Sequence, residues 1–312
     1  MRIGVMGAGA VGGYFGGLLA QSGEDVTFLA RPGRADVLLR DGLIIKSIHG
    51  DLTLRPKVVT SVAELGEVDV LIVALKNYHL DQAWADIRAA RARGAVILPL
   101  LNGVLHMDRF VEEFGAGYVL GGSCYIETTL SHLGHVIQTS EVRDIVYGPL
   151  PEGYAQNDAL ESTVKHLGDA FVRAQIPAFC REPILREMWK KYIFLCAFSG
   201  VTAATRVPIG EVLQHRASTT LFMGLVDELL AVATARKVDL SADKLRIAML
   251  ERARGIEPLM TSSMHRDLEK GQPLEVDSLQ GAMVVMAEQA GVSVPFHQAI
   301  CGVLAPHAVG RN

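Results

Sequence analysis

The sequence predicts an α/β N-terminal Rossmann domain with a mostly parallel sheet, followed by an all-α C-terminal domain. Three observations support this. Short apolar runs alternate with helical patterns in the first half, a glycine-rich turn joins the first run to the first helix, and strand-like alternation disappears after Pro183. Strands that alternate with helices imply a parallel sheet with right-handed crossovers. We expect the boundary near Cys180–Arg181, which gives domains of residues 1–180 and 181–312.

The strands of the first domain are expected where apolar residues run continuously, and the helices where apolar residues recur with helical spacing. Residues 43–59 alternate apolar and polar side chains around Gly50-Asp51, which predicts a hairpin. Residues 119–147 are more typical of antiparallel strands. The remaining expected strands cover residues 2–6, 25–30, 69–75 and 95–100, and the expected helices cover residues 10–22 and 78–93.

The second domain shows helical spacing throughout. Prolines stand near the expected helix starts, where a missing backbone N–H costs nothing. They are Pro183, Pro208, Pro273 and Pro295, and the helices are expected at residues 184–200, 217–237, 242–254 and 276–290.

Composition excludes several partner classes. The 312 residues carry a formal net charge of −4, which argues against nucleic acid as the main partner. The longest membrane-span candidate, residues 192–204, is too short to cross a bilayer, so we expect no membrane partner. The ten histidines show no H-x-x-x-H spacing, so no metal site is expected. The four cysteines form no C-x-x-C pair and fit a reducing, cytoplasmic compartment.

The strongest motif is the glycine-rich turn Gly7-Ala8-Gly9-Ala10-Val11-Gly12, which fits G-x-G-x-x-G between an expected strand and an expected helix. The first glycine permits the tight turn, the second lets the backbone approach a pyrophosphate, and the third lets helix and strand pack closely. The helix N-terminus then offers unpaired N–H groups to the phosphates. The motif therefore predicts a dinucleotide-binding site.

The residue after the second strand indicates which dinucleotide binds. Folds specific for NAD carry Asp or Glu there, to bind the ribose 2′-hydroxyl. This sequence has Arg31, with Arg34 nearby. A guanidinium suits a 2′-phosphate, so the sequence predicts NADP(H), although a solvated surface arginine is the alternative interpretation of Arg31.

Polar residues also follow two later strands. Lys76 comes directly after Leu75, and Asn102-Gly103 comes shortly after Leu100. Ligands of open α/β sheets bind outside the carboxyl ends of the strands, so both positions are expected to face the binding crevice. Either residue alone could equally be an ordinary loop residue.

The sequence resembles the ketopantoate reductase (2-dehydropantoate 2-reductase) family over nearly its whole length. The resemblance is carried by the order of motifs rather than by any single one. These motifs are the glycine turn, Arg31, Leu75-Lys76, Leu101-Asn102-Gly103, Glu187-Met-Trp-Lys-Lys191, Ser262-Ser263-Met264 with Asp267, and Leu274-Glu275-Val-Asp277 with Gly281. It implies an enzyme of pantothenate biosynthesis that uses NADPH to reduce a 2-oxo acid to a 2-hydroxy acid.

The resemblance also implies residue roles. Gly7, Gly9 and Gly12 would contact the dinucleotide, with Arg31 and Lys76 at its phosphates. Asn102 would lie near the nicotinamide and the substrate. Lys191 would be the catalytic lysine that protonates the forming alkoxide, Glu275 the glutamate of the catalytic site, and Ser263 a substrate-binding serine.

The chemistry of ketone reduction is compatible with these roles. Hydride delivery builds negative charge on oxygen, which a nearby ammonium stabilises and protonates. A carboxylate can orient that ammonium. Taken without the resemblance, Lys191 would be interpreted as a solvated helix residue and Glu275 as an acid in the first turn of a helix.

The sequence departs from the family pattern four and eight residues after the lysine. Authentic ketopantoate reductases usually carry asparagines there, and this chain has Leu195 and Ser199. Positions i, i+4 and i+8 share one helix face, so Lys191, Leu195 and Ser199 are expected to line one substrate-binding wall. The change does not alter the expected reaction type, but it leaves open which 2-oxo acid is the substrate. Alternatively, Leu195 only packs between domains.

The leading hypothesis is therefore an NADP-dependent 2-oxo acid reductase, either 2-dehydropantoate 2-reductase or a close paralogue. Two alternatives stay open: an NAD-dependent D-2-hydroxyacid dehydrogenase of the same superfamily, and a non-catalytic protein that senses NADP(H). The sequence does not fix the stereochemistry or the oligomeric state, and a homodimer is compatible with it.

Overall fold

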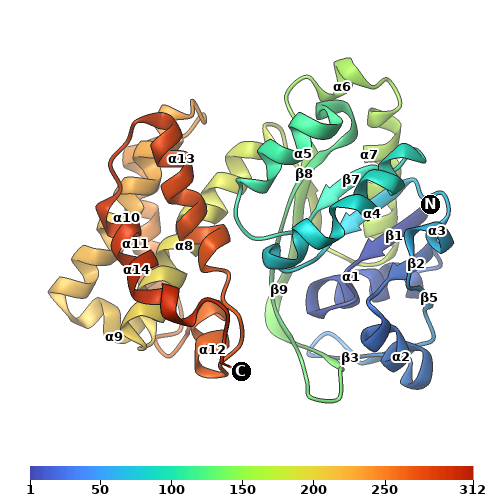
Figure 1. The fold of residues 1–312 in the computed structure, drawn as a ribbon, viewed down its shortest axis with the longest axis horizontal. Coiled ribbons are helices and arrows are strands. Elements are labelled where there is room, and N and C mark those ends of the chain that lie inside the picture. Colours follow the sequence, from blue (N-terminus) through green and yellow to red (C-terminus); the bar gives the residue numbers. More distant parts are fainter. Residues whose placement is uncertain (312) are drawn as a thin grey trace. The chain divides into compact units, whose positions relative to one another are not determined.

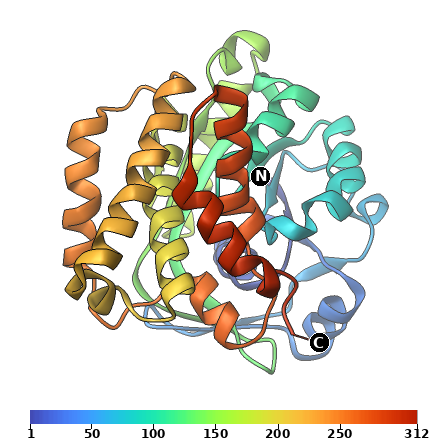
Figure 2. The ribbon, with the colours of Figure 1, turned by 60° about the vertical axis from the view of Figure 1, so that its left-hand side comes forward.

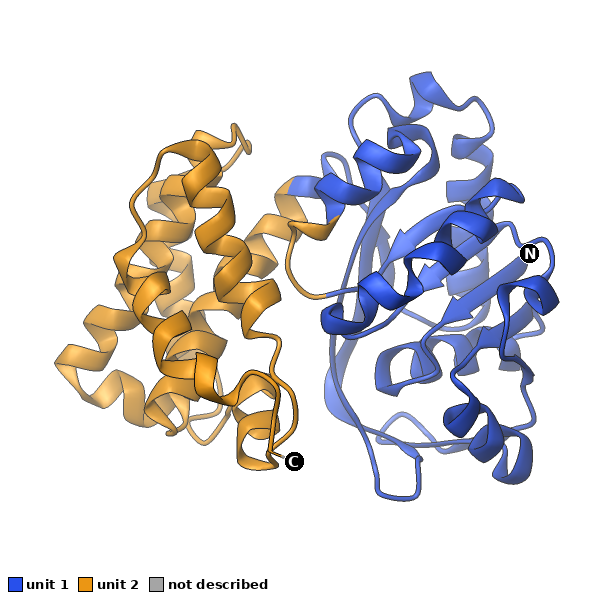
Figure 3. Cartoon of the chain, viewed as in Figure 1, with its two compact units in different colours: residues 1–101, 107–185 blue, residues 102–106, 186–312 orange. Residues whose placement is uncertain are grey.

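A computed structural model describes residues 1–311. The chain forms two compact units (Figure 3): unit 1 contains residues 1–101 and 107–185, and unit 2 contains residues 102–106 and 186–312. The division at residues 185 and 186 lies close to the boundary expected at residues 180 and 181. The sequence did not predict that residues 102–106, which follow a strand of unit 1, pack with unit 2.

Unit 1 is built around a five-stranded sheet in which every pairing is parallel (Figure 1). The strand order β5-β2-β1-β6-β7 places the first strand at the centre, which is the arrangement of nucleotide-binding Rossmann domains. The side chains of β6 are buried throughout, as expected of a parallel strand that is covered on both faces. The strands are β1 (Arg2–Met6), β2 (Asp25–Leu29), β5 (Lys57–Val59), β6 (Val70–Val73) and β7 (Val96–Pro99).

Two helices of unit 1 begin at helix-start signals in the sequence. Pro32 stands at the first position of α2, and Ser61 forms a capping box with Glu64 at the start of α3. The helices are α1 (Ala10–Gln21), α2 (Pro32–Asp41), α3 (Val62–Leu65), α4 (Leu80–Ala92), α5 (His106–Phe114), α6 (Gly153–Gln156) and α7 (Leu160–Arg173), with 3-10 turns η1 (Asn77–His79) and η2 (Ala116–Tyr118).

A second, mixed sheet completes unit 1, and the sequence predicted only parts of it. The expected hairpin exists as β3 and β4, which pair antiparallel, but β5 leaves it to join the parallel sheet. The antiparallel strands expected at residues 119–147 are β8 and β9. The strands of this sheet are β3 (Leu43–Ser47), β4 (Leu52–Leu54), β8 (Leu120–Leu130), β9 (Val136–Pro149) and β10 (Ala178–Cys180).

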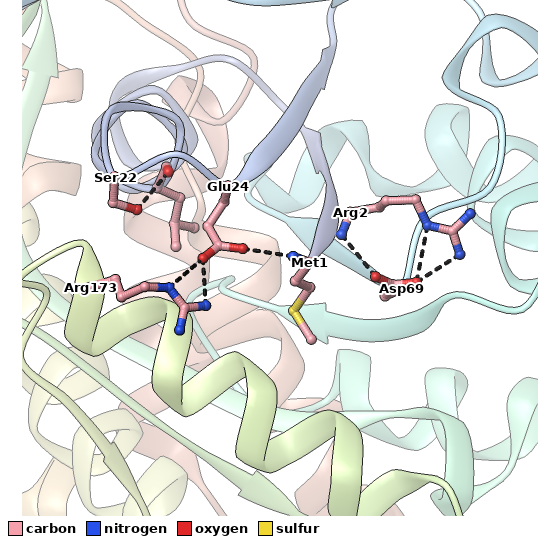
Figure 4. A network of polar contacts seen from close by, with 7 residues as sticks. Met1, Arg2, Ser22, Glu24, Asp69 and Arg173 are labelled. Carbon is pink, nitrogen blue, oxygen red and sulfur yellow. Dashed lines mark hydrogen bonds and ion pairs between the residues drawn. The ribbon is translucent and has the colours of Figure 1, made fainter.

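An ion-pair network ties the start of β1 to its neighbours in unit 1 (Figure 4). The N-terminal ammonium lies 2.8 Å from Glu24 Oε2, and the Arg173 guanidinium on α7 lies 2.6 Å from Glu24 Oε1. Burial alone raises the pKa of the Glu24 carboxyl. The hydrogen bonds and charges of these two cations together lower it by more, so the pKa of Glu24 lies below its usual value. Asp69 accepts from the backbone N–H of Arg2 at 2.8 Å, which holds the start of β6 beside β1.

The secondary-structure elements among the described residues of unit 2 are all helical, as predicted. Figure 2 shows this unit, in yellow to red, from a second direction. The helix expected at residues 276–290 begins with a π-helical turn, η3, and three shorter helices, α9, α12 and α14, were not predicted. The elements are α8 (Ile184–Thr205), α9 (Ile209–Gln214), α10 (Arg216–Ala235), α11 (Ala242–Gly255), α12 (Ser263–Glu269), η3 (Asp277–Gly281), α13 (Ala282–Ala290), α14 (Pro295–Leu304) and the 3-10 turn η4 (Ala305–His307).

Helix α10 is long and apolar enough to cross a membrane by length and composition alone, and half of that stretch is buried inside the structure. It also carries Glu228, whose carboxylate accepts from the backbone N–H groups of Phe296 and His297 at 2.7 and 3.0 Å. These bonds satisfy the N-terminus of α14. We therefore interpret α10 as the central packed helix of unit 2.

Candidate active site

Two glycines of the glycine-rich turn are required by the fold itself. Gly7 has a φ of +98°, and a Cβ atom there would lie 2.6 Å from the carbonyl oxygen of Ala74. A Cβ atom at Gly12 would collide with the carbonyl oxygen of Gly7. Side chains are therefore excluded at both positions, one for backbone conformation and one for helix–turn packing.

Gly9 meets a different requirement. A Cβ atom at Gly9 would have no heavy atom within 4 Å, so the space in front of it is open. Gly9 is also the N-cap of α1 and supplies no capping side chain. The first N–H groups of a helix have no partners within the helix and attract anions. The open space at this helix end fits the diphosphate of a dinucleotide such as NADP(H), with Ala8, Ala10 and Val11 completing the turn.

The structure gives the two arginines after β2 different uses. Arg34 donates from Nε to the carbonyl oxygen of Ala8 and from Nη1 to that of Gly134, both at 2.7 Å. Burial lowers the pKa of its guanidinium. Arg34 therefore braces the glycine turn against the β8–β9 hairpin, a role the sequence did not reveal. Arg31, the N-cap of α2, is exposed.

Lys76 and His79 lie at the same edge of the parallel sheet as Arg31. Lys76 is half-buried and precedes η1, just beyond the end of β6. Burial, and after it the charge of Arg31, lowers the pKa of the His79 imidazole. Because β1, β2 and β6 are adjacent and parallel, the glycine turn, Arg31 and Lys76 all follow carboxyl ends at one edge. His79 is a neighbour that the sequence analysis did not assign.

Unit 2 brings together three of the predicted site residues. The Lys191 ammonium donates to Asn102 Oδ1 at 3.2 Å, and Asn102 Nδ2 donates to Glu275 Oε2 at 3.3 Å. Lys191 lies on α8, Glu275 just precedes η3, and Asn102 lies on the segment of residues 102–106. An amide bridge therefore connects a cation to a carboxylate across three separate parts of the chain.

The charges of its neighbours fix the orientation of the Asn102 amide. Its oxygen faces the ammonium of Lys191, which can only donate, and its NH₂ group faces the carboxylate of Glu275, which accepts. The reverse orientation would place two donors together at Lys191 and two acceptors together at Glu275. The bridge therefore has one favourable arrangement, which holds the ammonium and the carboxylate at a fixed separation.

A fourth polar group, His106, belongs to the same region. It is buried, and burial lowers the pKa of its imidazole to about 4, with the nearby Glu275 carboxylate opposing and the Lys191 ammonium adding to that shift. The ring is therefore neutral at physiological pH. Sequence reasoning considered His106 only as a metal ligand. Its one local signal is its position, four residues after Asn102 on the same segment.

Gly103 allows the segment of residues 102–106 to approach η3. Its φ is +88°, and a Cβ atom there would lie 2.8 Å from the carbonyl oxygen of Ser278. A side chain at this position would push the segment away from η3 and strain its backbone. Gly103 thus serves the placement of Asn102, its immediate neighbour.

Leu195 and Ser199 have different surroundings. Leu195 is half-buried on α8. Ser199 is fully buried, donates to the carbonyl oxygen of Cys196 at 3.3 Å and lies 3.4 Å from the amide nitrogen of Gln280. The geometry places Ser199 in the packing of α8 against η3, so it gives no support to the prediction that its hydroxyl lines a substrate wall.

The two serines at the start of α12 also differ in their contacts and exposure. Ser262 is the buried N-cap: its hydroxyl accepts from the backbone N–H of His265 at 3.0 Å and from Thr202 Oγ1 at 2.9 Å. Ser263, the predicted substrate-binding serine, is the first residue of α12 and is only half-buried. Of the pair, Ser263 is the more accessible to a ligand.

Comparisons with known proteins cover both units. The family model "Ketopantoate reductase PanE/ApbA" matches residues 3–152, and the model of its C-terminal domain matches residues 183–308. The oxidoreductase YkpB of Bacillus subtilis is 34% identical over 96% of this chain and 96% of its own. A 2-dehydropantoate 2-reductase of Nostoc sp. is 28% identical over 94% of this chain and 92% of its own.

Solved structures share the fold over nearly the whole chain. The 2-dehydropantoate 2-reductase of Geobacter metallireducens has a TM-score of 0.86 at 28% identity, covering 98% of this chain and 99% of its own. A ketopantoate reductase from Ralstonia eutropha has a TM-score of 0.86 at 26% identity, covering 99% and 98%. A D-mandelate dehydrogenase with NADH and anilino(oxo)acetate has a TM-score of 0.87 at 21% identity, covering 99% and 98%, a similarity of fold alone.

The pKa of His106 leads to a prediction about stability and pH. The native pKa of about 4 lies below the ordinary value of 6.5, so the unfolded chain binds the proton more tightly between these values. The free energy of unfolding should therefore fall as the pH falls from 6.5 to 4. His106→Gln should remove roughly 3 kcal/mol of that decline, since one pKa unit corresponds to about 1.4 kcal/mol.

Urea denaturation at pH 7.5 and pH 4 measures this difference. His166→Gln, at an exposed position, is the matched control and should decline with pH as the native chain does. Equal declines for His106→Gln and the native chain would show that His106 is not buried as a neutral ring.

Proposed function

The chain belongs to the ketopantoate reductase family, and from this premise we propose that it reduces a 2-oxo acid to a 2-hydroxy acid with NADPH. The observation that carries the proposal is the bridge from Lys191 through Asn102 to Glu275. It holds a proton donor in a fixed, partly buried environment, as the reduction of a ketone requires. The glycine turn and Arg31 of unit 1 supply the features that a phosphorylated dinucleotide needs.

The residues of unit 2 handle the carbonyl oxygen in this proposal. NADPH, when bound, supplies the hydride that adds to the carbonyl carbon. Lys191 stabilises the negative charge that develops on the carbonyl oxygen and donates a proton to it. The product is the 2-hydroxy acid, and the lysine regains its proton from solvent. Ser263 is proposed to bind the substrate.

Asn102 and Glu275 act on the lysine. The amide oxygen holds the ammonium by one hydrogen bond, and the carboxylate fixes the amide from its other end. This limits the positions that the ammonium can take and so reduces the conformational freedom that is lost when substrate binds. His106 remains neutral, because its pKa is about 4, and therefore adds no competing proton donor at physiological pH.

The preference for NADPH rests on Arg31. Its exposure after β2 leaves the guanidinium accessible to a 2′-phosphate, whereas Arg34 is occupied with the glycine turn. Lys76, half-buried after β6, is proposed as a second cation for the cofactor phosphates. Relatives named 2-dehydropantoate 2-reductase support ketopantoate as a candidate substrate. With that substrate, the proposed role is in pantothenate biosynthesis, in the cytoplasm.

The reaction is tested by NADPH oxidation with a panel of 2-oxo acids that includes ketopantoate. The native chain should oxidise NADPH with at least one of them. Lys191→Ala should lower kcat by ~10² or more through loss of the general acid and leave NADPH affinity nearly unchanged. Lys190→Ala is the matched control, because Lys190 pairs with Glu187 on the same helix and is 40% exposed.

Two outcomes would contradict this proposal. Native turnover by Lys191→Ala would show that the lysine is structural. Binding of NADPH without oxidation by any acid in the panel would favour a protein that senses NADP(H) instead.

The cofactor preference is tested separately. NADPH should bind more tightly than NADH by about 1.5 to 3 kcal/mol, the value of a charge-assisted contact, and Arg31→Ala should remove most of the difference. Arg40→Ala, at the far end of α2, should leave the difference unchanged, because Arg40 is exposed and pairs with Asp41. Fluorescence titration measures both affinities. Equal binding of the two cofactors by the native chain would favour an NAD-dependent dehydrogenase.

The substrate is tested through Leu195. A site that hydrogen-bonds the hydroxyl of ketopantoate rejects analogues without it, because a buried polar group is left unpaired. An apolar Leu195 imposes no such penalty, so an unhydroxylated branched 2-oxo acid should be used within about tenfold of ketopantoate in kcat/KM. Leu195→Asn should shift the preference toward ketopantoate, and Leu195→Met should not. A native preference for ketopantoate of several orders of magnitude would mean that Leu195 does not contact this part of the substrate.

A further inference from the structure

The π-helical turn η3 lies directly after Glu275 in the chain. The carbonyl oxygen of Glu275 accepts from the backbone N–H of Leu279 at 3.0 Å and from the Ser278 hydroxyl at 3.1 Å. The backbone of Glu275 is thus part of the hydrogen bonding of η3. π-helical turns are rare and occur frequently at functional sites. A displacement of η3 would move the Glu275 carboxylate with it.

Two buried side chains join η3 to α8, the helix that carries Lys191. The Tyr192 hydroxyl, on α8, donates to the carbonyl oxygen of Leu279 at 2.6 Å. In the opposite direction, Gln280 Nε2, on η3, donates to the carbonyl oxygen of Cys196 at 2.8 Å. Tyr192 and Gln280 are 1% and 0% exposed, so neither bond competes with bulk water. We call this pair of contacts the η3 clamp.

Close backbone packing accompanies the η3 clamp. A Cβ atom at Gly200 on α8 would lie 2.9 Å from Gln280 Nε2, and a Cβ atom at Gly103 would lie 2.8 Å from the carbonyl oxygen of Ser278. The turn therefore touches both α8 and the segment that carries Asn102. All three members of the amide bridge are anchored around this one turn.

The hydrogen-bond lengths indicate why the bridge needs such an anchor. The two bonds of the bridge, at 3.2 and 3.3 Å, lie at or just beyond the long end of the usual range, so a small displacement of Glu275 would break its bond to Asn102. The two bonds of the clamp, at 2.6 Å from a hydroxyl donor and 2.8 Å from an amide donor, lie well within the usual ranges. The clamp bonds are thus shorter than those of the bridge, and they are buried.

The burial of Gln280 also has a free-energy cost that packing alone does not explain. Its Oε1 atom is buried and has no hydrogen-bond partner among the described residues. Leaving such an acceptor unpaired is unfavourable, and an apolar side chain of the same size would avoid it. The amide is thus present for its N–H donors, which reach α8 at Cys196 and Ser199.

We propose that Gln280 and Tyr192 are positioning residues, which hold η3 against α8 and thereby set the distance from Glu275 through Asn102 to Lys191. The inference rests on the proposed function, because it assigns the clamp to the proton donor of that reaction. The proposal also assigns a structural role to Ser199, because its hydroxyl lies beside the Gln280 amide.

The test uses Gln280→Met and Tyr192→Phe, each of which removes hydrogen-bonding groups while nearly keeping the side-chain size. Each is made in the native chain and in Glu275→Gln. In the native background, kcat should fall about tenfold or more while KM for NADPH stays within about twofold, because only transition-state stabilisation is lost. In the Glu275→Gln background the further loss should be under about twofold, since coupled residues are not additive.

Thr205→Val is the matched control, because among residues 1–311 its hydroxyl bonds only the Val201 carbonyl on the same helix, at 2.7 Å. It should leave kcat unchanged in both backgrounds. Losses for the clamp variants that are equal in the two backgrounds, or an unchanged kcat, would overturn the proposal and leave the clamp a structural contact.

Hydrogen exchange of the amides of residues 277–281 provides a readout that needs no substrate. Exchange should become faster in Gln280→Met and Tyr192→Phe and stay unchanged in Thr205→Val. If the native chain reduces no 2-oxo acid, the proposed function fails, and faster exchange then still supports the clamp. Unchanged exchange in both clamp variants overturns the clamp whether or not the enzyme is active.

Discussion

The amide of Asn102 is the constraint on which the candidate catalytic groups depend. It contacts both the ammonium of Lys191 and the carboxylate of Glu275, and the two charges fix its orientation. Asn102 follows β7 of the parallel sheet within a few residues, yet its segment packs with the helical unit. The chain therefore supplies the centre of the bridge from one end of a strand and both of its charged ends from the second half of the sequence.

Features set by local sterics could be predicted to the residue from the sequence. The glycine turn is such a case, because Gly7 and Gly12 are required by contacts within the turn and with the adjacent strand end. The bounds of β1 follow from a short apolar run directly before that turn. The helical character of the second half was also predictable, since helical spacing repeats over many turns.

Features set by contacts distant in sequence were not predictable. Nothing near residues 102–106 signals that they pack with the helical unit, because their neighbours Glu275 and Ser278 lie more than 170 residues further along the chain. The same holds for β5, which leaves its expected hairpin for the parallel sheet. Arg34 and Ser199 have side chains typical of ligand-binding positions, and only the fold shows that protein groups occupy them.

The bridge through Asn102 has a chemical consequence. Through the neutral Asn102 amide, the Glu275 carboxylate helps to orient the Lys191 ammonium, the proton donor of the proposed reaction. The neutral His106 ring adds no further charge at this site. The geometry therefore suits a site whose cation must be ordered, and the buried contacts between α8 and η3 hold the elements that carry the two charged ends of the bridge.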